Sequence, residues 1–119
     1  MIIENLLIDI KEKYYTQFSF DDCTFINKLK FDFYLPKYNL LIEYDGIQHF
    51  QPVEYYGGES GYKMNKLRDE IKNKYCKKNK INFLRIPYTY NTLEEIEKYI
   101  LDFINKIIQN PNKHHYKIL

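Results

Sequence analysis

Residues 29–50 read Leu-Lys-Phe-Asp-Phe-Tyr-Leu-Pro-Lys-Tyr-Asn-Leu-Leu-Ile-Glu-Tyr-Asp-Gly-Ile-Gln-His-Phe, and this stretch decides the fold. Apolar residues alternate with polar ones on both sides of Pro36 and Asn39, two residues that favour turns over central strand positions. The pattern predicts two strands, 29–35 and 40–45, joined by a tight turn. In the first strand, we expect residues 29, 31, 33 and 35 to share one apolar face.

Three carboxylates follow from this hairpin. Asp32 lies on the polar face of the first strand, and Glu43 and Asp45 project together from the second, about 7 Å apart. If the strands pair, Asp32 comes close to both, and the crowded charges need a compensating cation. The alternative is that these acids decorate the solvent face of an ordinary hairpin. We favour a functional site, because Gln48 and His49 follow directly and no basic residue intervenes.

The remaining elements are predicted from periodicity and caps. Residues 2–13 have helical apolar spacing, 14–20 favour a strand before a turn at 21–23, and 50–62 form a loop rich in Gly and Pro. A helix is expected from Gly61 to about Lys80, then a strand over 82–88 parallel to the one before it. Thr92 and Glu95 form a capping box that begins a last helix, which Pro111 ends.

The helix expected after Gly61 is strongly basic. Residues 63–80 hold eight basic and two acidic residues, although the formal net charge of the whole chain is only +2. Such an asymmetric surface is suited to nucleic-acid phosphates, and a solvated helix face is the alternative. The candidate nucleic-acid contacts are Lys63, Lys66, Lys74, Lys77 and Lys78.

Length and composition indicate one domain over residues 1–119, with a core over 2–108 and a flexible tail over 109–119. Cys23 and Cys76 lack the spacing of a zinc site or disulfide framework, so we expect reduced thiols in the cytoplasm or nucleus. No secretory signal is evident at the N-terminus, and no apolar run approaches membrane-spanning length.

The expected order helix, three strands, helix, strand, helix resembles the αβββαβ core of the PD-(D/E)XK nuclease superfamily. The strings Phe-Asp-Phe-Tyr-Leu-Pro, Ile-Glu-Tyr-Asp-Gly-Ile-Gln-His-Phe, Arg-Asp-Glu-Ile-Lys and Phe-Leu-Arg-Ile-Pro resemble its branch of very-short-patch-repair and phage or intron homing endonucleases. The resemblance covers residues 30–106. It implies an α/β, restriction-endonuclease-like fold with a mixed central sheet flanked by helices, and a phage or viral origin.

The resemblance also implies roles for single residues. Asp32 and Glu43 would be the motif acids, and Asp45 stands where many members have a lysine that orients or activates water. Gln48, His49 and Lys72 are the candidates to replace that lysine. Supporting roles would belong to Asp69 beside Lys72, and to Glu4 in the first helix. The cysteine and histidine set that binds zinc in the repair enzymes has no match here.

The residues fit phosphodiester hydrolysis on chemical grounds as well. Asp32, Glu43 and Asp45 would bind Mg²⁺, or Mn²⁺ in its place, and His49 would act as a general base or donor. We therefore predict a metal-dependent DNA endonuclease, with RNA left open as a substrate and a homodimer as one route to cutting both strands. The alternatives are a catalytically inactive nucleic-acid-binding module of the same fold and a metal-stabilised structural domain.

Overall fold

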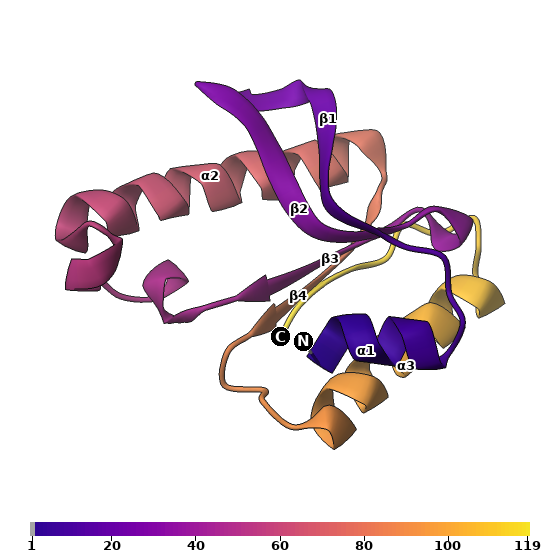
Figure 1. Ribbon diagram of the computed structural model, residues 1–119. Coiled ribbons are helices and arrows are strands. Elements are labelled where there is room, and N and C mark those ends of the chain that lie inside the picture. The colour runs from indigo at the N-terminus through magenta and orange to yellow at the C-terminus, as the bar shows by residue number, and fades with distance from the viewer. Residues whose placement is uncertain (1) are drawn as a thin grey trace.

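The computed structural model describes residues 2–119 as an α/β fold built on a mixed five-stranded sheet (Figure 1). The strands lie in the order β1-β2-β3-β4-β5. The first three are antiparallel neighbours, whereas β4 runs parallel to β3, as predicted, and β5 runs parallel to β4. The elements are α1 (Ile2–Asp9), β1 (Tyr15–Phe25), β2 (Asn27–Leu35), β3 (Leu40–Asp45), α2 (Gly58–Asn79), β4 (Asn82–Pro87), α3 (Leu93–Gln109) and β5 (Tyr116–Ile118).

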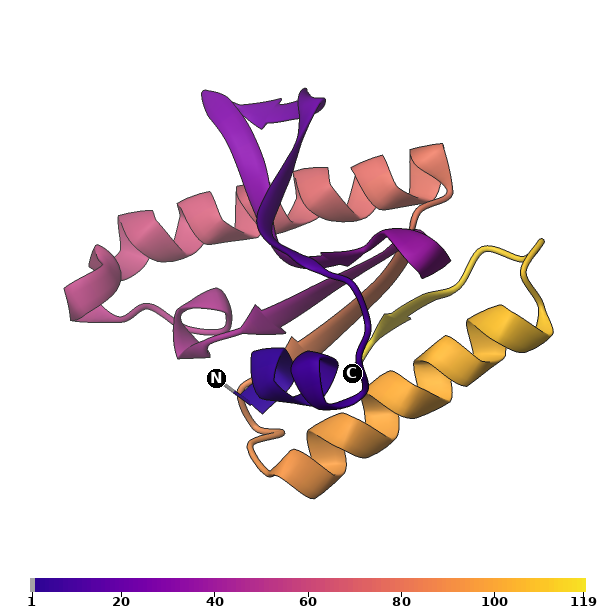
Figure 2. The same ribbon diagram turned by 45° about the vertical axis from the view of Figure 1, so that its right-hand side comes forward.

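The sheet separates two apolar cores. Helices α1 and α3 cover one face and α2 covers the other (Figure 2). Strand β3 contributes to both cores, because Leu40 and Ile42 face α1 and α3 while Leu41 faces α2. Glu43 and Asp45 continue the Leu41 face, as the alternation predicted, and are therefore buried beneath α2.

The first strand of the central hairpin is less regular than predicted. Phe33 packs in the core with α1 and α3, whereas Phe31 packs in the core with α2. The predicted alternation is confirmed, since residues 29, 31, 33 and 35 are all buried, but the four positions divide between the two cores. The physical reason is that β2 pairs with β3 only from Phe33 to Leu35, while its first half follows β1 in a hairpin that extends past α2 (Figures 1 and 2).

Residues 21–23 do not form the predicted turn. They lie inside β1, where the register with β2 shifts between Ser19 and Thr24, and the hairpin reverses at Ile26, whose φ is 68°. Cys23 is buried in the α2 core, and Asp22 accepts a hydrogen bond from the Tyr75 hydroxyl of α2. These tertiary contacts hold a bulge in a segment whose composition favours a turn.

The predicted helices all form, with shifted ends. Helix α1 is shorter than the predicted 2–13, and α2 begins at Gly58 rather than Gly61. Thr92 is confirmed as the N-cap of α3, because its Oγ1 accepts the Glu95 N–H at 3.2 Å, and its hydroxyl donates to Glu95 Oε1 at 2.9 Å in place of the reciprocal capping-box bond. Within residues 2–119, every helix is too short or too polar to cross a membrane.

The C-terminal segment contains a strand where a flexible tail was expected. Strand β5 pairs with β4, and His115 is buried beside it. Asn82 fixes this arrangement, since its side chain donates to the Tyr38 carbonyl and accepts the His115 N–H, at 2.8 and 2.9 Å. The described core thus extends beyond residue 108.

Candidate functional site

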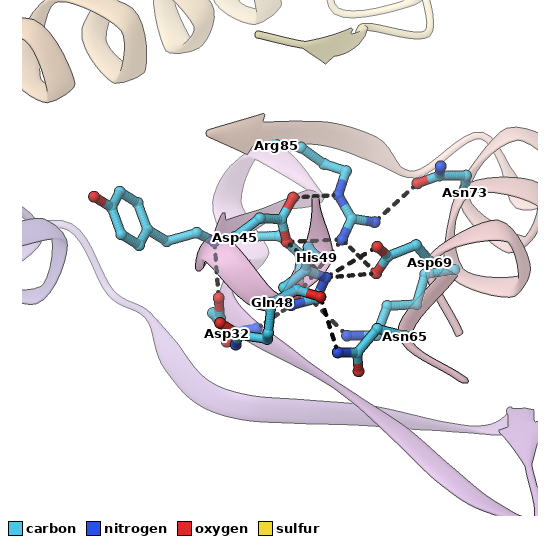
Figure 3. Close-up of polar contacts among 11 residues, drawn as sticks. Asp32, Asp45, Gln48, His49, Asn65, Asp69, Asn73 and Arg85 are labelled. Atoms are coloured by element: carbon cyan, nitrogen blue, oxygen red, sulfur yellow. Dashed lines mark hydrogen bonds and ion pairs between the residues drawn. The ribbon is translucent and has the colours of Figure 1, made fainter. Parts of the chain in front are cut away.

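A buried ionic cluster lies where β3 and β4 end beneath α2 (Figure 3). The parallel register places Glu43 beside Arg85, so acids of β3 and a base of β4 become neighbours. Helix α2 adds Asp69, Lys72 and Asn73, which share one face at i, i+3 and i+4. The periodicities of strand and helix therefore bring these side chains together in one cluster.

Arg85 is the centre of this cluster. Its Nε and Nη2 donate to the two Asp45 oxygens, each at 2.8 Å, and Nη2 also donates to Asp69 Oδ1 at 2.8 Å. Its Nη1 donates to Asn73 Oδ1 at 3.0 Å. Burial opposes the charge of Arg85, but these carboxylates raise its pKa, so the guanidinium remains charged.

His49 and Asp69 form a second polar pair. His49 lies in a 3-10 turn (Ile47–His49) after β3, and its Nδ1 lies 2.9 Å from Asp69 Oδ2 and 3.7 Å from Asp45 Oδ1. This hydrogen bond raises the pKa of His49, against the opposing effect of burial. Burial likewise opposes ionisation of Asp69, yet His49 and Arg85 together lower its pKa. With Nδ1–H donating to Asp69, Nε2 is left as a proton acceptor.

Glu43 is the most deeply buried predicted catalytic residue. It is 3% exposed, and burial raises its pKa to about 7 despite the opposing charge of Lys72. Lys72 Nζ donates to Glu43 Oε2 at 3.1 Å, and Arg85 Nη2 lies 3.9 Å from the same oxygen. The predicted candidate Lys72 therefore does reach the central acid, from a helix rather than from the strand.

Asp32 and Glu43 exchange hydrogen bonds with the backbone of the opposite strand. Glu43 Oε1 accepts the Asp32 N–H at 2.7 Å, and Asp32 Oδ2 accepts the Tyr44 N–H at 2.8 Å. These bonds continue the β2–β3 pairing beyond its last ladder pair, at Phe33 and Ile42. Burial raises the pKa of Asp32, which remains partly exposed.

The closest metal-compatible grouping differs from the predicted trio. In the described part of the chain, the one group of at least three acids, histidines or cysteines whose donor atoms all lie within 4.8 Å is Asp45, His49 and Asp69. Asp32 and Glu43 lie outside this group. Asp32 accepts the Tyr44 N–H, and Glu43 accepts the Asp32 N–H and a hydrogen bond from Lys72. Asp45 belongs to both sets, and its own oxygens are occupied by Arg85.

The other predicted residues lie around this cluster. Gln48 is partly buried, and its backbone carbonyl accepts a hydrogen bond from the Asn65 side chain at 3.3 Å. Glu4 accepts from the Tyr14 hydroxyl and lines, with Asp32, a pocket of about 100 Å³. Another pocket, of about 240 Å³, is lined by Asp45, His49, Asp69 and Arg85. The five predicted nucleic-acid contacts on α2 are all exposed: Lys63, Lys66, Lys74, Lys77 and Lys78.

The sequence analysis missed Arg85 and Asn73 as members of the site. A signal was available for Arg85, because it interrupts the apolar run Phe83, Leu84, Ile86 in a strand predicted to be central. A buried arginine requires acidic partners, and Glu43 and Asp45 were the nearest unpaired acids in the predicted sheet. Asn73 carries no comparable signal, since an asparagine on a polar helix is ordinary.

Comparisons with known proteins give two viral relatives. The chain is 32% identical over 62 residues to "Uncharacterized protein 307L" of Invertebrate iridescent virus 6, covering 51% of this chain and 32% of that protein. It is 33% identical over 64 residues to "Uncharacterized protein 033L" of Invertebrate iridescent virus 3, covering 53% and 33%. The aligned part thus spans about a third of each relative. No protein-family model matches the chain, and no solved structure matches it.

Proposed function

We propose that this protein is a metal-dependent endonuclease that hydrolyses phosphodiester bonds in DNA, encoded by a virus or phage. The observation that carries the proposal is the contact of Lys72 with buried Glu43 inside a cluster that also holds Asp45, His49 and Asp69. The α/β fold with a mixed sheet between helices also supports the proposal, because the sequence resembles a restriction-endonuclease-like core. In that core a strand lysine normally stands at the position of Asp45, and Lys72 would take over its role.

The charge of the cluster supports a divalent cation. Asp32, Glu43, Asp45 and Asp69 carry four formal negative charges when ionised, and Lys72 and Arg85 supply two positive ones. Two negative charges are left when His49 is neutral. Asp32, Glu43 and Asp45 would hold the cation, because His49 and Asp69 are then left to take the proton of the attacking water. Carboxylate ligands suit both Mg²⁺ and Mn²⁺. The cation would neutralise charge that develops on the phosphate.

The protein groups have separate parts in the reaction. A water oxygen attacks phosphorus as the bond to the leaving oxygen breaks, and His49 Nε2 takes the proton from that water. Asp69 holds the His49 ring through Nδ1, so it is a positioning residue. Lys72 offers an ammonium to the phosphate oxygens. Arg85 keeps Asp45 and Asp69 in place through three hydrogen bonds, and a fourth joins it to Asn73.

The lysines on the outer faces of α2 would bind the DNA backbone. Lys66 lines the pocket that contains Asp45 and His49, so the basic surface begins at the site itself. Lys74, Lys77 and Lys78 are exposed nearer the end of the helix. Several exposed lysines along one helix favour a nucleic-acid substrate over a small phosphate ester.

A catalytically inactive DNA-binding module is the second candidate. The observation in its favour is that Arg85 and Lys72 already compensate Asp45 and Glu43 within the fold. Incubation with supercoiled plasmid and with branched DNA, in Mg²⁺, Mn²⁺, Ca²⁺ or chelator, separates the two. Nicking that requires Mg²⁺ or Mn²⁺ supports the enzyme, whereas salt-sensitive binding without cleavage supports the module.

A further inference from the structure

A basic pocket lies at the other end of the sheet from the ionic cluster. Its volume is about 300 Å³, and it is formed where β3 and β4 begin and where α3 has ended. Lys37, Lys80, Lys113 and His114 line it together with Asn39 and Asn112. Among its lining residues there is no Asp or Glu, although the whole chain contains 16. The pocket therefore concentrates positive charge without internal compensation.

The three lysines come from separate segments and are not paired. Lys37 lies in the 3-10 turn Pro36–Tyr38, Lys80 follows α2, and Lys113 follows α3. None of them forms an ion pair with a carboxylate of residues 2–119. All three are exposed, so water and salt screen their mutual repulsion, and an anion bound in the pocket would reduce it further.

Two pocket residues adopt left-handed backbone conformations. Lys80 has φ 53° and ψ 42° at the C-cap of α2, and Asn39 has φ 47° and ψ 50° after the 3-10 turn. Asparagine tolerates this conformation, but at the end of a helix glycine is the usual residue. A lysine there is strained relative to glycine. Such strain is common where a side chain binds a ligand.

We infer that this pocket binds a phosphate group, and that the phosphate belongs to the backbone of a nucleic acid lying along α2. Lys80 follows the end of α2, and Lys77 is exposed on that helix between Lys80 and Lys66, which lines the pocket beside the ionic cluster. Lys66 and Lys80 are 14 residues apart, or roughly 20 Å along a helix, which corresponds to about six base pairs. The nucleic-acid source rests on the proposed function, whereas the phosphate site itself does not.

The phosphate site is tested by titrating the full chain with inorganic phosphate and following backbone amide resonances. We expect shifts at the amides around Lys80 and Lys113 in the wild type and in the control Lys98→Gln, an exposed lysine of α3. The shifts should be lost in Lys80→Gly and Lys113→Gln. Because glycine relieves the left-handed backbone, Lys80→Gly should unfold at the same or a higher temperature than the wild type, so lost binding would not reflect unfolding.

The source of the phosphate is tested with a DNA duplex in Ca²⁺, by measuring affinity against salt concentration. Each of the two variants should lower the log-log slope by about 0.9, and Lys98→Gln should not change it. Phosphate-induced shifts with an unchanged slope would assign the pocket to free phosphate and overturn the nucleic-acid source. If Lys80→Gly and Lys113→Gln change neither the phosphate-induced amide shifts nor the salt dependence of DNA affinity, the pocket does not bind phosphate. If the wild type does not cleave DNA, the proposed function is contradicted, but the amide shifts and the salt dependence of DNA affinity still test the phosphate site.

Discussion

Lys72 Nζ lies 3.1 Å from Oε2 of Glu43, and both side chains are buried between α2 and β3. This contact joins the lysine-rich helix to the acidic strand. It also places an ammonium beside the acid that stands at the centre of the proposed active site. Substitutions of these two residues, and of the side chains that bind to the acids around them, therefore test the proposed site.

Lys72→Met should abolish most DNA cleavage. It removes the cation that would face the phosphate, and losing one preorganised donor costs on the order of 10² to 10³ in rate. The measurement is the nicking rate in Mn²⁺, with DNA affinity in Ca²⁺ as the control for folding and binding. A Lys72→Met protein that nicks at the wild-type rate would leave the Glu43–Lys72 contact a structural one.

Asp69→Asn should lower the nicking rate and move the acidic limb of its pH profile to lower pH. The Asp69 hydrogen bond raises the pKa of His49, and His49 must be neutral to accept a proton. In the wild type the rate therefore rises with pH through this raised pKa. Without the carboxylate that pKa falls, so the limb shifts downward. A lower rate with an unshifted limb would show that His49 is not the base.

Glu43→Gln should stabilise the protein relative to the wild type as pH rises from about 5 to 8. The folded-state pKa of Glu43, about 7, is above its ordinary value of 4.5, so the folded protein binds this proton more tightly than the unfolded chain. The wild type consequently loses stability through this window, and glutamine cannot ionise. The difference in free energy of unfolding should grow by up to about 3 kcal/mol.

Urea unfolding of both proteins at several pH values gives this difference directly. The titration of His49 occurs in both proteins and cancels in the comparison to first order. A difference that stays constant with pH would mean that Glu43 ionises as it does in water.

Arg85→Met should destabilise the fold by about 3 to 5 kcal/mol, because buried Asp45 and partly buried Asp69 lose their partner. Lys98→Met, at an exposed position of α3, is the control and should change the free energy of unfolding by less than about 0.5 kcal/mol. Denaturant unfolding at neutral pH measures both. A loss below about 1 kcal/mol in Arg85→Met would show that Asp45 and Asp69 do not depend on it.

The features predicted correctly are those set by local chemistry. Alternation along β3 placed Glu43 and Asp45 together on one face, and the capping box located the start of α3. The parallel pairing of β3 and β4 followed from the helix that connects them. Each of these depends on residues that are close in sequence or on strands that one helix connects, so a single sequence is enough to predict it.

The features that were missed depend on contacts distant in sequence. Strand β5 exists because Asn82 binds His115, 33 positions later, and its three residues carry no strong pattern of their own. Burial of Cys23 against α2 overrode the turn composition of residues 21–23. Arg85 reaches Asp45 across 40 positions, so the apolar run around it indicates its burial, whereas its partners follow only from the pairing of β3 with β4.

The measurement that tests the central claim most directly is plasmid nicking by Glu43→Gln beside the wild type. Glutamine preserves the shape of the side chain, and its single carbonyl oxygen can accept from either Lys72 or the Asp32 N–H, so the fold should persist with one of these two hydrogen bonds lost. We expect the wild type to nick supercoiled plasmid in Mg²⁺ or Mn²⁺, and the variant to bind DNA in chelator as tightly as the wild type, or slightly more tightly, without nicking it. Nicking by Glu43→Gln at the wild-type rate would contradict an active site built on Glu43.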